Sequence, residues 1–200
     1  MIALIDHGVG NLRSVQKSLK TVGANVVVTS DPDEILQAEK VILPGVGAFG
    51  DAMDGLLNRG LDVVVRQVVA LGKPLLGICV GMQLLFETSS ELGIYTGLGI
   101  LPGDVRRFQT NTLKIPQTGW NQIFIRKDSP LVNGLEPGSY AYFNHSFYCS
   151  PVNDDVIGET EYGINYASVV GRGRLYGVQF HPEKSQSVGL KMLKNFVELC

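Results

Sequence analysis

Residues 74–87 read PLLGICVGMQLLFE, an apolar run with one cysteine between two glycines, followed by an amphipathic stretch. The spacing Gly77-x-Cys79-x-Gly81 is typical of a nucleophile elbow, a strained turn between a strand and a helix. The glycines of such a turn let neighbouring backbone approach closely, and the positive end of the helix dipole makes a thiol more acidic. The stretch therefore predicts a nucleophilic Cys79. Because cysteines in apolar segments are commonly buried and inert, the elbow alone leaves a structural cysteine as an equal alternative.

A second motif supplies partners for a nucleophile. The apolar residues Leu175–Phe180 predict a short buried strand that leads directly into His181-Pro182-Glu183. Side chains two residues apart in extended backbone point the same way, and Pro182 keeps His181 out of the helical region. Glu183 can then orient the imidazole, as the third member of a nucleophile–base–orienter triad does. Without the elbow, a structural histidine beside a surface acid would be the better interpretation; with it, the sequence favours a Cys79–His181–Glu183 triad.

A glycine-bounded turn offers a place for negative charge to develop. Pro44-Gly45-Val46-Gly47 follows the apolar residues Val41–Leu43, which predict a buried strand. Backbone beside glycine can present an N–H outward, and one donor aimed at a forming oxyanion is worth about a hundredfold or more in rate. The candidate donors are the N–H groups of Val46 and Val80. A plain turn between a strand and a helix explains this segment equally well.

Composition and charge exclude several classes of protein. The chain has 200 residues, of which 44% are hydrophobic and 18% charged, and this suits one well-cored α/β domain spanning residues 1–200. A net charge of −2 without a basic run gives no reason to expect a nucleic-acid partner. No stretch has the length of a membrane helix, and the first residues lack the pattern of a signal peptide. Three widely spaced cysteines do not form a disulfide framework and fit the cytoplasm.

The order of the expected elements indicates the fold class. Strand-like runs alternate with helical patterns through the first half, which is typical of parallel β-α-β construction. Helices are predicted from Asn11 to Gly23, from Asp31 onward, from Leu61 to Leu71 and from Val188 to Leu199. Short strands are predicted in the second half at Val105–Phe108, Gln122–Ile125, Tyr140–His145, Val156–Thr160 and Tyr166–Val170. We therefore expect a single α/β domain with a central, mostly parallel or mixed sheet flanked by helices.

The sequence gives no support for a cofactor or a metal. Gly8-Val9-Gly10 follows the first strand, but Arg13 occupies the position where a dinucleotide fingerprint needs its third glycine. A zinc site built from Cys79, His145, Cys149 and His181 would lack the paired-cysteine spacing typical of such sites.

Motifs distributed along nearly the whole chain carry a family resemblance. They are Asp6–Leu12, Pro44–Gly47 with Phe49-Gly50, the elbow through Gln83, Pro116 with Gly119–Asn121, Tyr142-Phe143 with His145-Ser146, and Gln179–Ser185. In these motifs the chain resembles the class I (triad) glutamine amidotransferases, and among them the glutaminase subunits of imidazole glycerol phosphate synthase. His7 stands where these proteins often have tyrosine, and Phe147 also replaces a usual tyrosine.

The resemblance implies an activity, a substrate site and a partner. Cys79 would attack glutamine, His181 would pass a proton to the leaving ammonia, and water would hydrolyse the thioester. The resemblance also places the bound glutamine against the backbone at Gly47, the side chain of Gln83, and the backbone of Ser146 and Phe147. Ammonia would pass to a cyclase subunit in a heterodimer, with Asn11, Trp120, Tyr142 and Lys184 at or near the partner surface.

Other functions remain open at this point. The same triad occurs in the glutaminases of anthranilate, carbamoyl phosphate and pyridoxal phosphate synthesis, although the last typically has a glycine-only turn in place of Pro44–Gly47. A non-catalytic scaffold of the same fold is the alternative from another class, and the intact triad argues against it. For Trp120, a buried position at the start of a strand is the alternative to an exposed contact.

Overall fold

Parallel strands form the centre of the sheet in the computed structural model, which describes residues 1–152 and 154–200. Their spatial order is β2 (Val26–Thr29), β1 (Ile2–Ile5), β3 (Lys40–Leu43), β4 (Leu75–Ile78) and β13 (Leu175–Val178). Every residue of β1, β4 and β13 is buried. Uninterrupted apolar runs suit this position, because a parallel sheet is covered on both faces.

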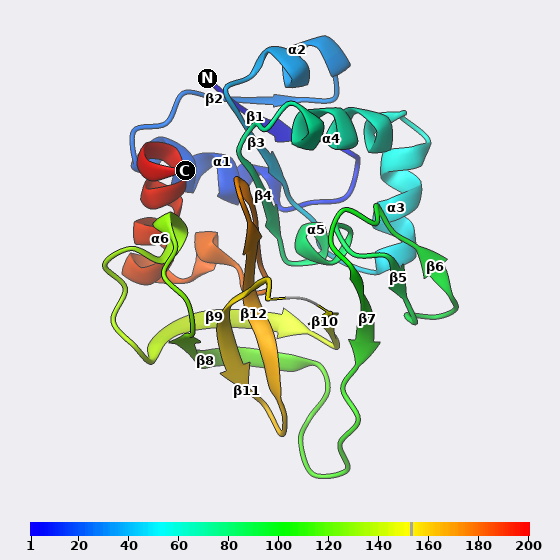
Figure 1. The fold of residues 1–200 in the computed structure, drawn as a ribbon, viewed down its shortest axis with the longest axis vertical. Helices are drawn as coiled ribbons and strands as arrows, with labels where there is room; N and C mark the ends of the chain where they lie inside the picture. Colours follow the sequence, from blue (N-terminus) through cyan, green and yellow to red (C-terminus); the bar gives the residue numbers. More distant parts are fainter. Residues whose placement is uncertain (153) are drawn as a thin grey trace.

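Helices cover the two faces of the parallel strands. They are α1 (Leu12–Thr21), α2 (Pro32–Gln37), α3 (Phe49–Leu57), α4 (Leu61–Ala70), α5 (Val80–Gln83) and α6 (Gln186–Leu199), with short 3-10 turns η1 (Pro130–Val132) and η2 (Pro182–Lys184). Helix α1 packs with α6, and α4 packs with α2 and α3, on either side of β4 (Figure 1). None of the helices in the described ranges is long and apolar enough to cross a membrane.

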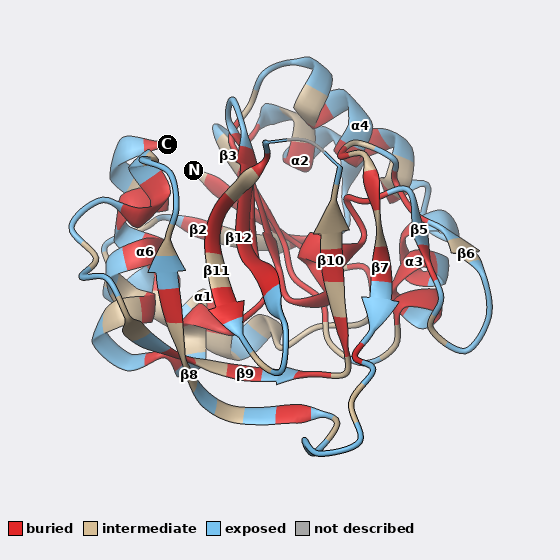
Figure 2. Cartoon of the chain, turned by 60° about the horizontal axis from the view of Figure 1, so that its bottom comes forward, coloured by how far each residue is buried: buried red, intermediate tan, exposed pale blue. Residues whose placement is uncertain are grey.

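The sheet continues beyond β13 with further strands. They are β5 (Thr88–Ser89), β6 (Tyr95–Thr96), β7 (Gly103–Arg107), β8 (Gln117–Ile125), β9 (Ser139–His145), β10 (Phe147–Pro151), β11 (Val156–Glu161) and β12 (Asn165–Arg172). These strands pair antiparallel, except for β5, which runs parallel to β7. Strand β12 pairs with β13, and β8 pairs with β9 in a strip joined to the sheet through β11. Figure 2 shows buried residues concentrated along the inner strands, while β8 also carries intermediate and exposed residues. The chain is therefore an α/β protein with one large mixed sheet, as predicted.

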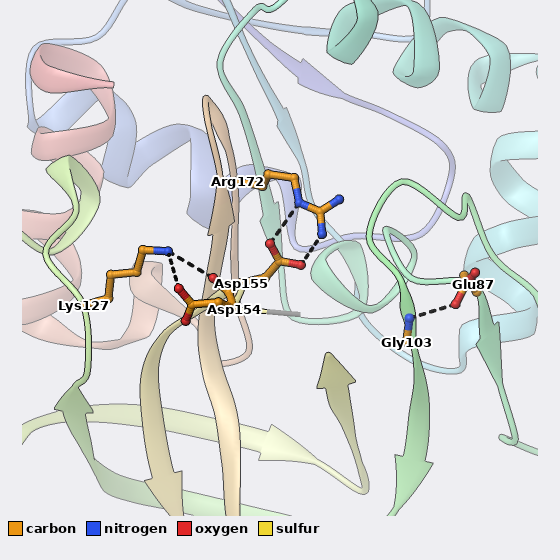
Figure 3. A network of polar contacts seen from close by, with 6 residues as sticks. All are labelled: Glu87, Gly103, Lys127, Asp154, Asp155 and Arg172. Carbon is orange, nitrogen blue, oxygen red and sulfur yellow. Dashed lines mark hydrogen bonds and ion pairs between the residues drawn. The ribbon is translucent and has the colours of Figure 1, made fainter. Parts of the chain in front are cut away.

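Polar contacts tie the loops to this sheet (Figure 3). Arg172 at the end of β12 holds the buried carboxylate of Asp155 through Nε at 2.9 Å and Nη2 at 2.5 Å. Glu87, which follows α5, accepts the N–H of Gly103 at 2.8 Å and so fixes the start of β7. Lys127 contacts Asp154 at the surface, where such a pair adds little stability.

Local signals predicted several boundaries correctly. Helix α2 begins as expected, because the Asp31 side chain accepts the N–H groups of Asp33 and Glu34 and Pro32 occupies the first helical position. Helix α4 begins at Leu61, and the chain turns away at Gly72 with a φ of +66°. Capping and turn chemistry of this kind depends on neighbours in sequence, so the sequence carries it.

Other features differ from the predictions. Helix α3 and strand β10 were not predicted, and β13 ends at Val178 rather than at Phe180. The closing helix α6 begins at Gln186, two residues before the predicted start at Val188, and Leu199 at its last turn is half exposed. Asn11 occupies the N-cap position of α1 without making a side-chain cap bond, and its Nδ2 donates to a residue outside the helix.

Candidate active site

Cys79 lies on the strained turn that its glycines predict. It joins β4 to α5 with φ 55° and ψ −113°, a region that residues with a side chain rarely adopt. A Cβ on Gly81 would collide with the carbonyl of Leu43, and one on Gly77 would lie 2.7 Å from the carbonyl oxygen of Gly81. Both glycines are therefore required by close backbone contacts. Helix α5 is only one turn long, so its dipole gives Cys79 less help than a longer helix would.

Strand pairing brings the histidine motif to the elbow. Strand β13 runs parallel to β4 with Val178 opposite Ile78, and the N–H of Cys79 donates to the carbonyl of Val178 at 2.8 Å. Three residues later, His181 is buried, and its N–H donates to the carbonyl of Tyr142 at 2.9 Å. Two adjacent strand ends thus bring Cys79 and His181 together.

The imidazole of His181 lies between sulfur and carboxylate. Its Nδ1 is 3.0 Å from Oε1 of Glu183, and both side chains are almost fully buried. Burial lowers the pKa of His181, but hydrogen bonds and charge interactions with Cys79 and Glu183 outweigh it and raise the pKa to about 10. At neutral pH the site therefore holds an imidazolium beside the sulfur.

Asn11 contacts the carboxylate of the predicted triad. Its Nδ2 donates to Oε1 of Glu183 at 3.3 Å, the same oxygen that meets His181. Within residues 1–152 and 154–200, Oε2 of Glu183 is buried without a partner. The residue placed near the partner surface by resemblance is thus also the group that holds Glu183 in position.

The glycine-bounded turn packs directly on the elbow. A Cβ on Gly45 would lie 2.6 Å from the backbone nitrogen of Gly81, so only glycine allows this approach. Val80 is the first residue of α5, and its N–H has no partner within the helix. Val46 and Val80 line one cavity with Cys79. The oxyanion assignment of their N–H groups stays a prediction, and their position beside the sulfur agrees with it.

The cavity at Cys79 has a volume of about 230 Å³. The predicted site residues that line it are Val46, Gly47, Cys79, Val80, Gln83, Ser146, Phe147, His181 and Lys184. A larger hollow of about 830 Å³ lies beside η1, but none of these residues lines it. The predicted site residues therefore gather at the smaller cavity.

Three further residues belong to this site and were not assigned from the sequence. Glu91 lines the cavity and accepts the N–H of Phe49 at 2.7 Å, while burial raises its pKa. His145 also lines it, and Gln179 lies with its Nε2 3.8 Å from Cys79 Sγ. The expected alternation of side chains in extended backbone could also have indicated Gln179, whereas no local signal marks Glu91. For Glu183 that expectation is wrong, because Glu183 lies in the 3-10 turn η2 and meets His181 through this turn.

Aromatic residues lie at the surface beside the site. Trp120 is 46% exposed and contacts Tyr142 edge-to-face, with 6.2 Å between ring centroids. Lys184 Nζ lies 5.6 Å from the centroid of the Tyr142 ring. The alternative of a core tryptophan is therefore wrong. Because the carbonyl of Tyr142 also accepts the N–H of His181, this surface connects directly to the segment between β13 and η2.

Comparison with known proteins identifies the family. Residues 3–200 match the family described as glutamine amidotransferase class-I. The chain is 51% identical over 196 residues to imidazole glycerol phosphate synthase subunit HisH of Bacillus cereus strain ATCC 14579, covering 98% of this chain and 93% of that protein. It is 52% identical over 199 residues to the protein of the same name from Moorella thermoacetica, covering 99% and 94%.

Solved structures share the fold at low sequence identity. A crystal structure of a glutamine amidotransferase matches with a TM-score of 0.77 at 18% identity, covering 99% of this chain and 98% of that one. The structure of PurLQS from Thermotoga maritima matches with a TM-score of 0.76 at 20% identity, covering 98% and 96%. These likenesses show the shared fold. The sequence match over residues 3–200 shows that the chain belongs to the class I glutamine amidotransferase family.

Proposed function

We propose that this protein is the glutaminase subunit of imidazole glycerol phosphate synthase, an enzyme of histidine biosynthesis, and that residues 1–200 form its amidotransferase domain. It hydrolyses glutamine to glutamate and ammonia. The observation that carries the chemistry is the buried line of Cys79, His181 and Glu183 at two adjacent strand ends. The subunit assignment is supported by the identity of about half of all residues to proteins of that name.

The reaction begins at the sulfur. Cys79 Sγ attacks the side-chain amide carbon of glutamine, and the carbonyl oxygen becomes an oxyanion that accepts from the N–H groups of Val46 and Val80. The imidazolium of His181 gives its proton to the nitrogen as the C–N bond breaks, and ammonia leaves. A water molecule then attacks the thioester carbon, gives a proton to His181, and releases glutamate and the thiolate. Glu183 holds the imidazole in one orientation through both steps.

The free end of the substrate meets acceptors in the cavity. Nε2 of Gln83 donates to the carbonyl of Phe147 and to Oε1 of Gln179, both at 3.2 Å. Its Oε1 is therefore available to accept from a ligand. Glu91 adds a carboxylate to the same cavity. Two acceptors suit the α-ammonium of glutamine, while backbone N–H groups near Gly47, Ser146 and Phe147 suit its carboxylate.

We place the cyclase subunit against the surface of Trp120, Tyr142 and Lys184, in a heterodimer through which ammonia reaches the cyclase. Asn11 lies at the edge of this contact. Exposed aromatics are common anchors of interfaces, and this surface adjoins the strand that carries His181. The three free cysteines fit a reducing compartment, and we place the enzyme in the cytoplasm.

The test is the coupled reaction with the cyclase and its phosphorylated ribulosyl nucleotide substrate. Glutamine should support formation of imidazole glycerol phosphate and the aminoimidazole carboxamide ribotide. Cys79→Ser should abolish this reaction while the reaction driven by added ammonium remains nearly intact. Parallel loss of the ammonium-driven reaction would make Cys79 structural, and glutamine hydrolysis coupled only to anthranilate or pyridoxal phosphate synthesis would reassign the subunit.

A further inference from the structure

A line of buried side-chain amides ends at the sulfur of Cys79. Nε2 of Gln179 lies 3.8 Å from Cys79 Sγ, within the range of a hydrogen bond to sulfur. Oε1 of Gln179 accepts from Nε2 of Gln83 at 3.2 Å, and the same nitrogen donates to the carbonyl of Phe147 at 3.2 Å. Gln179 is 0% exposed and Gln83 is 2% exposed, so bulk water does not compete for these bonds.

The carbonyl of Phe147 fixes the direction of each donor. A carbonyl only accepts, so the group of Gln83 that faces it is the NH2 group. The second hydrogen of that group is directed at Gln179, which must present Oε1 to it. Gln179 is then left with its own NH2 group toward Cys79. Reversing either amide would place two donors or two acceptors against each other.

A second donor holds the same carbonyl. Nδ1 of His145 lies 2.7 Å from the oxygen of Phe147. Burial lowers the pKa of His145 to about 4, so its ring is neutral, with the hydrogen on Nδ1. Its Nε2 lies 3.2 Å from the hydroxyl oxygen of Tyr166. The carbonyl that orients the two glutamines is therefore itself held from both sides.

A neutral donor at sulfur has a role that His181 does not fill. A hydrogen bond to the thiolate is charge-assisted and is stronger than one to the thiol, so it favours the reactive form. His181 gives its proton to the departing ammonia and receives one back from the attacking water, so its charge changes during the reaction. Gln179 keeps its hydrogen throughout, and it is still in place when the sulfur leaves as a thiolate in the hydrolysis of the thioester.

We propose that Gln179 is a further catalytic residue, which donates an N–H to the sulfur of Cys79 and stabilises the thiolate when it attacks and when it leaves. The role in turnover rests on the proposed glutaminase function. The hydrogen bond itself is open to a test that uses no glutamine.

That test measures how fast iodoacetamide alkylates Cys79 as a function of pH, with the modified peptide quantified by mass spectrometry. Gln179→Met keeps the length of the side chain and removes the donor. The midpoint of its pH profile should lie about one unit above that of the wild type, which lowers the alkylation rate near neutral pH by about tenfold. Gln117→Met is the matched control, because Gln117 is equally buried but contacts Tyr166 and not Cys79; its profile should match the wild type.

Turnover with the cyclase present gives the second measurement. Gln179→Met should lower kcat by about tenfold or more and leave KM within about threefold, because the donor acts on the sulfur and not on the substrate. An unchanged alkylation profile in folded Gln179→Met protein overturns the proposal. A shifted profile in a protein whose wild type hydrolyses no glutamine would instead support the hydrogen bond and reject the glutaminase function.

If Gln179→Met does not fold, a second variant and a spectroscopic measurement test the same hydrogen bond. Gln179→Glu keeps the shape of the side chain and replaces the N–H donor with a carboxylate oxygen. Its alkylation profile should shift to higher pH by at least as much as that of Gln179→Met. If both variants are unfolded by circular dichroism, the side-chain amide resonance of Gln179 in isotope-labelled wild-type protein should move as Cys79 titrates. A resonance that does not move would overturn the proposal.

Discussion

His7 donates its Nε2 hydrogen to the carbonyl of Pro44 at 2.8 Å, which ties the loop after β1 to the turn that carries Val46. The carbonyl of His7 is held in turn by Arg59 at 2.9 Å. His7 is 1% exposed, and its Nδ1 is buried without a partner in the described part of the chain. Pro44 is therefore a fixed point, and any rotation of the Val46 peptide must take place beyond it, between Gly45 and Gly47.

Removal of this anchor should loosen the turn. His7→Phe keeps a ring but leaves the Pro44 carbonyl without its donor, which should lower the free energy of unfolding by about 1–3 kcal/mol. Glutaminase turnover with the cyclase present should fall by about tenfold, because the oxyanion donor is less well placed. His7→Tyr is the control, since its hydroxyl restores a donor at the end of a ring. If His7→Phe and His7→Tyr have the same free energy of unfolding in urea and the same kcat, His7 does not anchor the turn through its hydrogen bond to Pro44.

The base and its orienting carboxylate should differ in their contributions. His181→Ala removes the proton carrier and should slow thioester formation by about 10⁴-fold or more. Glu183→Gln can still present an oxygen to both His181 and Asn11, so it loses charge but keeps geometry, and a loss of about 10²-fold is expected. Single-turnover trapping with 6-diazo-5-oxonorleucine measures both rates. A folded Glu183→Gln as inactive as His181→Ala would show that Glu183 does more than orient the ring.

The buried imidazole of His145 predicts a loss of stability in acid. Burial lowers its pKa from 6.5 to about 4, so between these values the unfolded chain binds a proton that the folded chain does not. Stability therefore falls as the pH drops below about 6.5, and the full loss of about 3 kcal/mol is reached near pH 4. Urea unfolding at pH 7 and pH 5 measures this dependence. His145→Gln removes the titrating group, and an equally steep dependence in that variant would contradict the assignment.

The isolated subunit should be a slow glutaminase. A turn that rotates at little energetic cost can keep the Val46 N–H away from the cavity until the partner binds. We expect turnover to rise at least about a hundredfold when the cyclase and its nucleotide ligand are added. Full turnover by the purified chain alone would contradict a switch.

Trp120→Ala should weaken this response or the association itself, measured by titration of the cyclase. Since Trp120 is 46% exposed, the variant should keep the fold. Leu92→Ala, at a more exposed apolar residue far along the sequence, is the control and should titrate like the wild type. An unchanged response in Trp120→Ala would place the partner on another surface.

The triad could be predicted from sequence because each part depends on short-range geometry. Gly77 and Gly81 flank Cys79, and His181 and Glu183 are two residues apart. The extended backbone expected for this pair is wrong, because Glu183 lies in the 3-10 turn η2, and this tight turn brings its carboxylate to the imidazole. The contact of Asn11 with Glu183 could not be predicted in this way, because 172 positions separate the two residues. Only the docking of α1 against η2 brings them together.

The elements of the fold also divide into those set by neighbours in sequence and those set by distant contacts. Asp31 and Pro32 mark the start of α2 through local bonds, so its position follows from sequence. Helix α3 follows Ala48, which provides no cap, and its first N–H is instead bound by Glu91 from a distant loop. Strand β10 follows β9 after Ser146 alone, without the glycine or proline that usually marks a turn. Such elements are defined by tertiary contacts.

Strand β13 enters the sheet between β4 and β12, although it follows every other strand in sequence. Gln179 comes 100 positions after Cys79, so a growing chain carries its thiol long before it carries the groups that make the thiol reactive. Until β13 is inserted, the parallel and antiparallel halves of the sheet also lack their common neighbour. Assembly of the sheet and completion of the surroundings of Cys79 are thus one event, and a partly folded chain lacks the neighbours of the sulfur that the proposed mechanism requires.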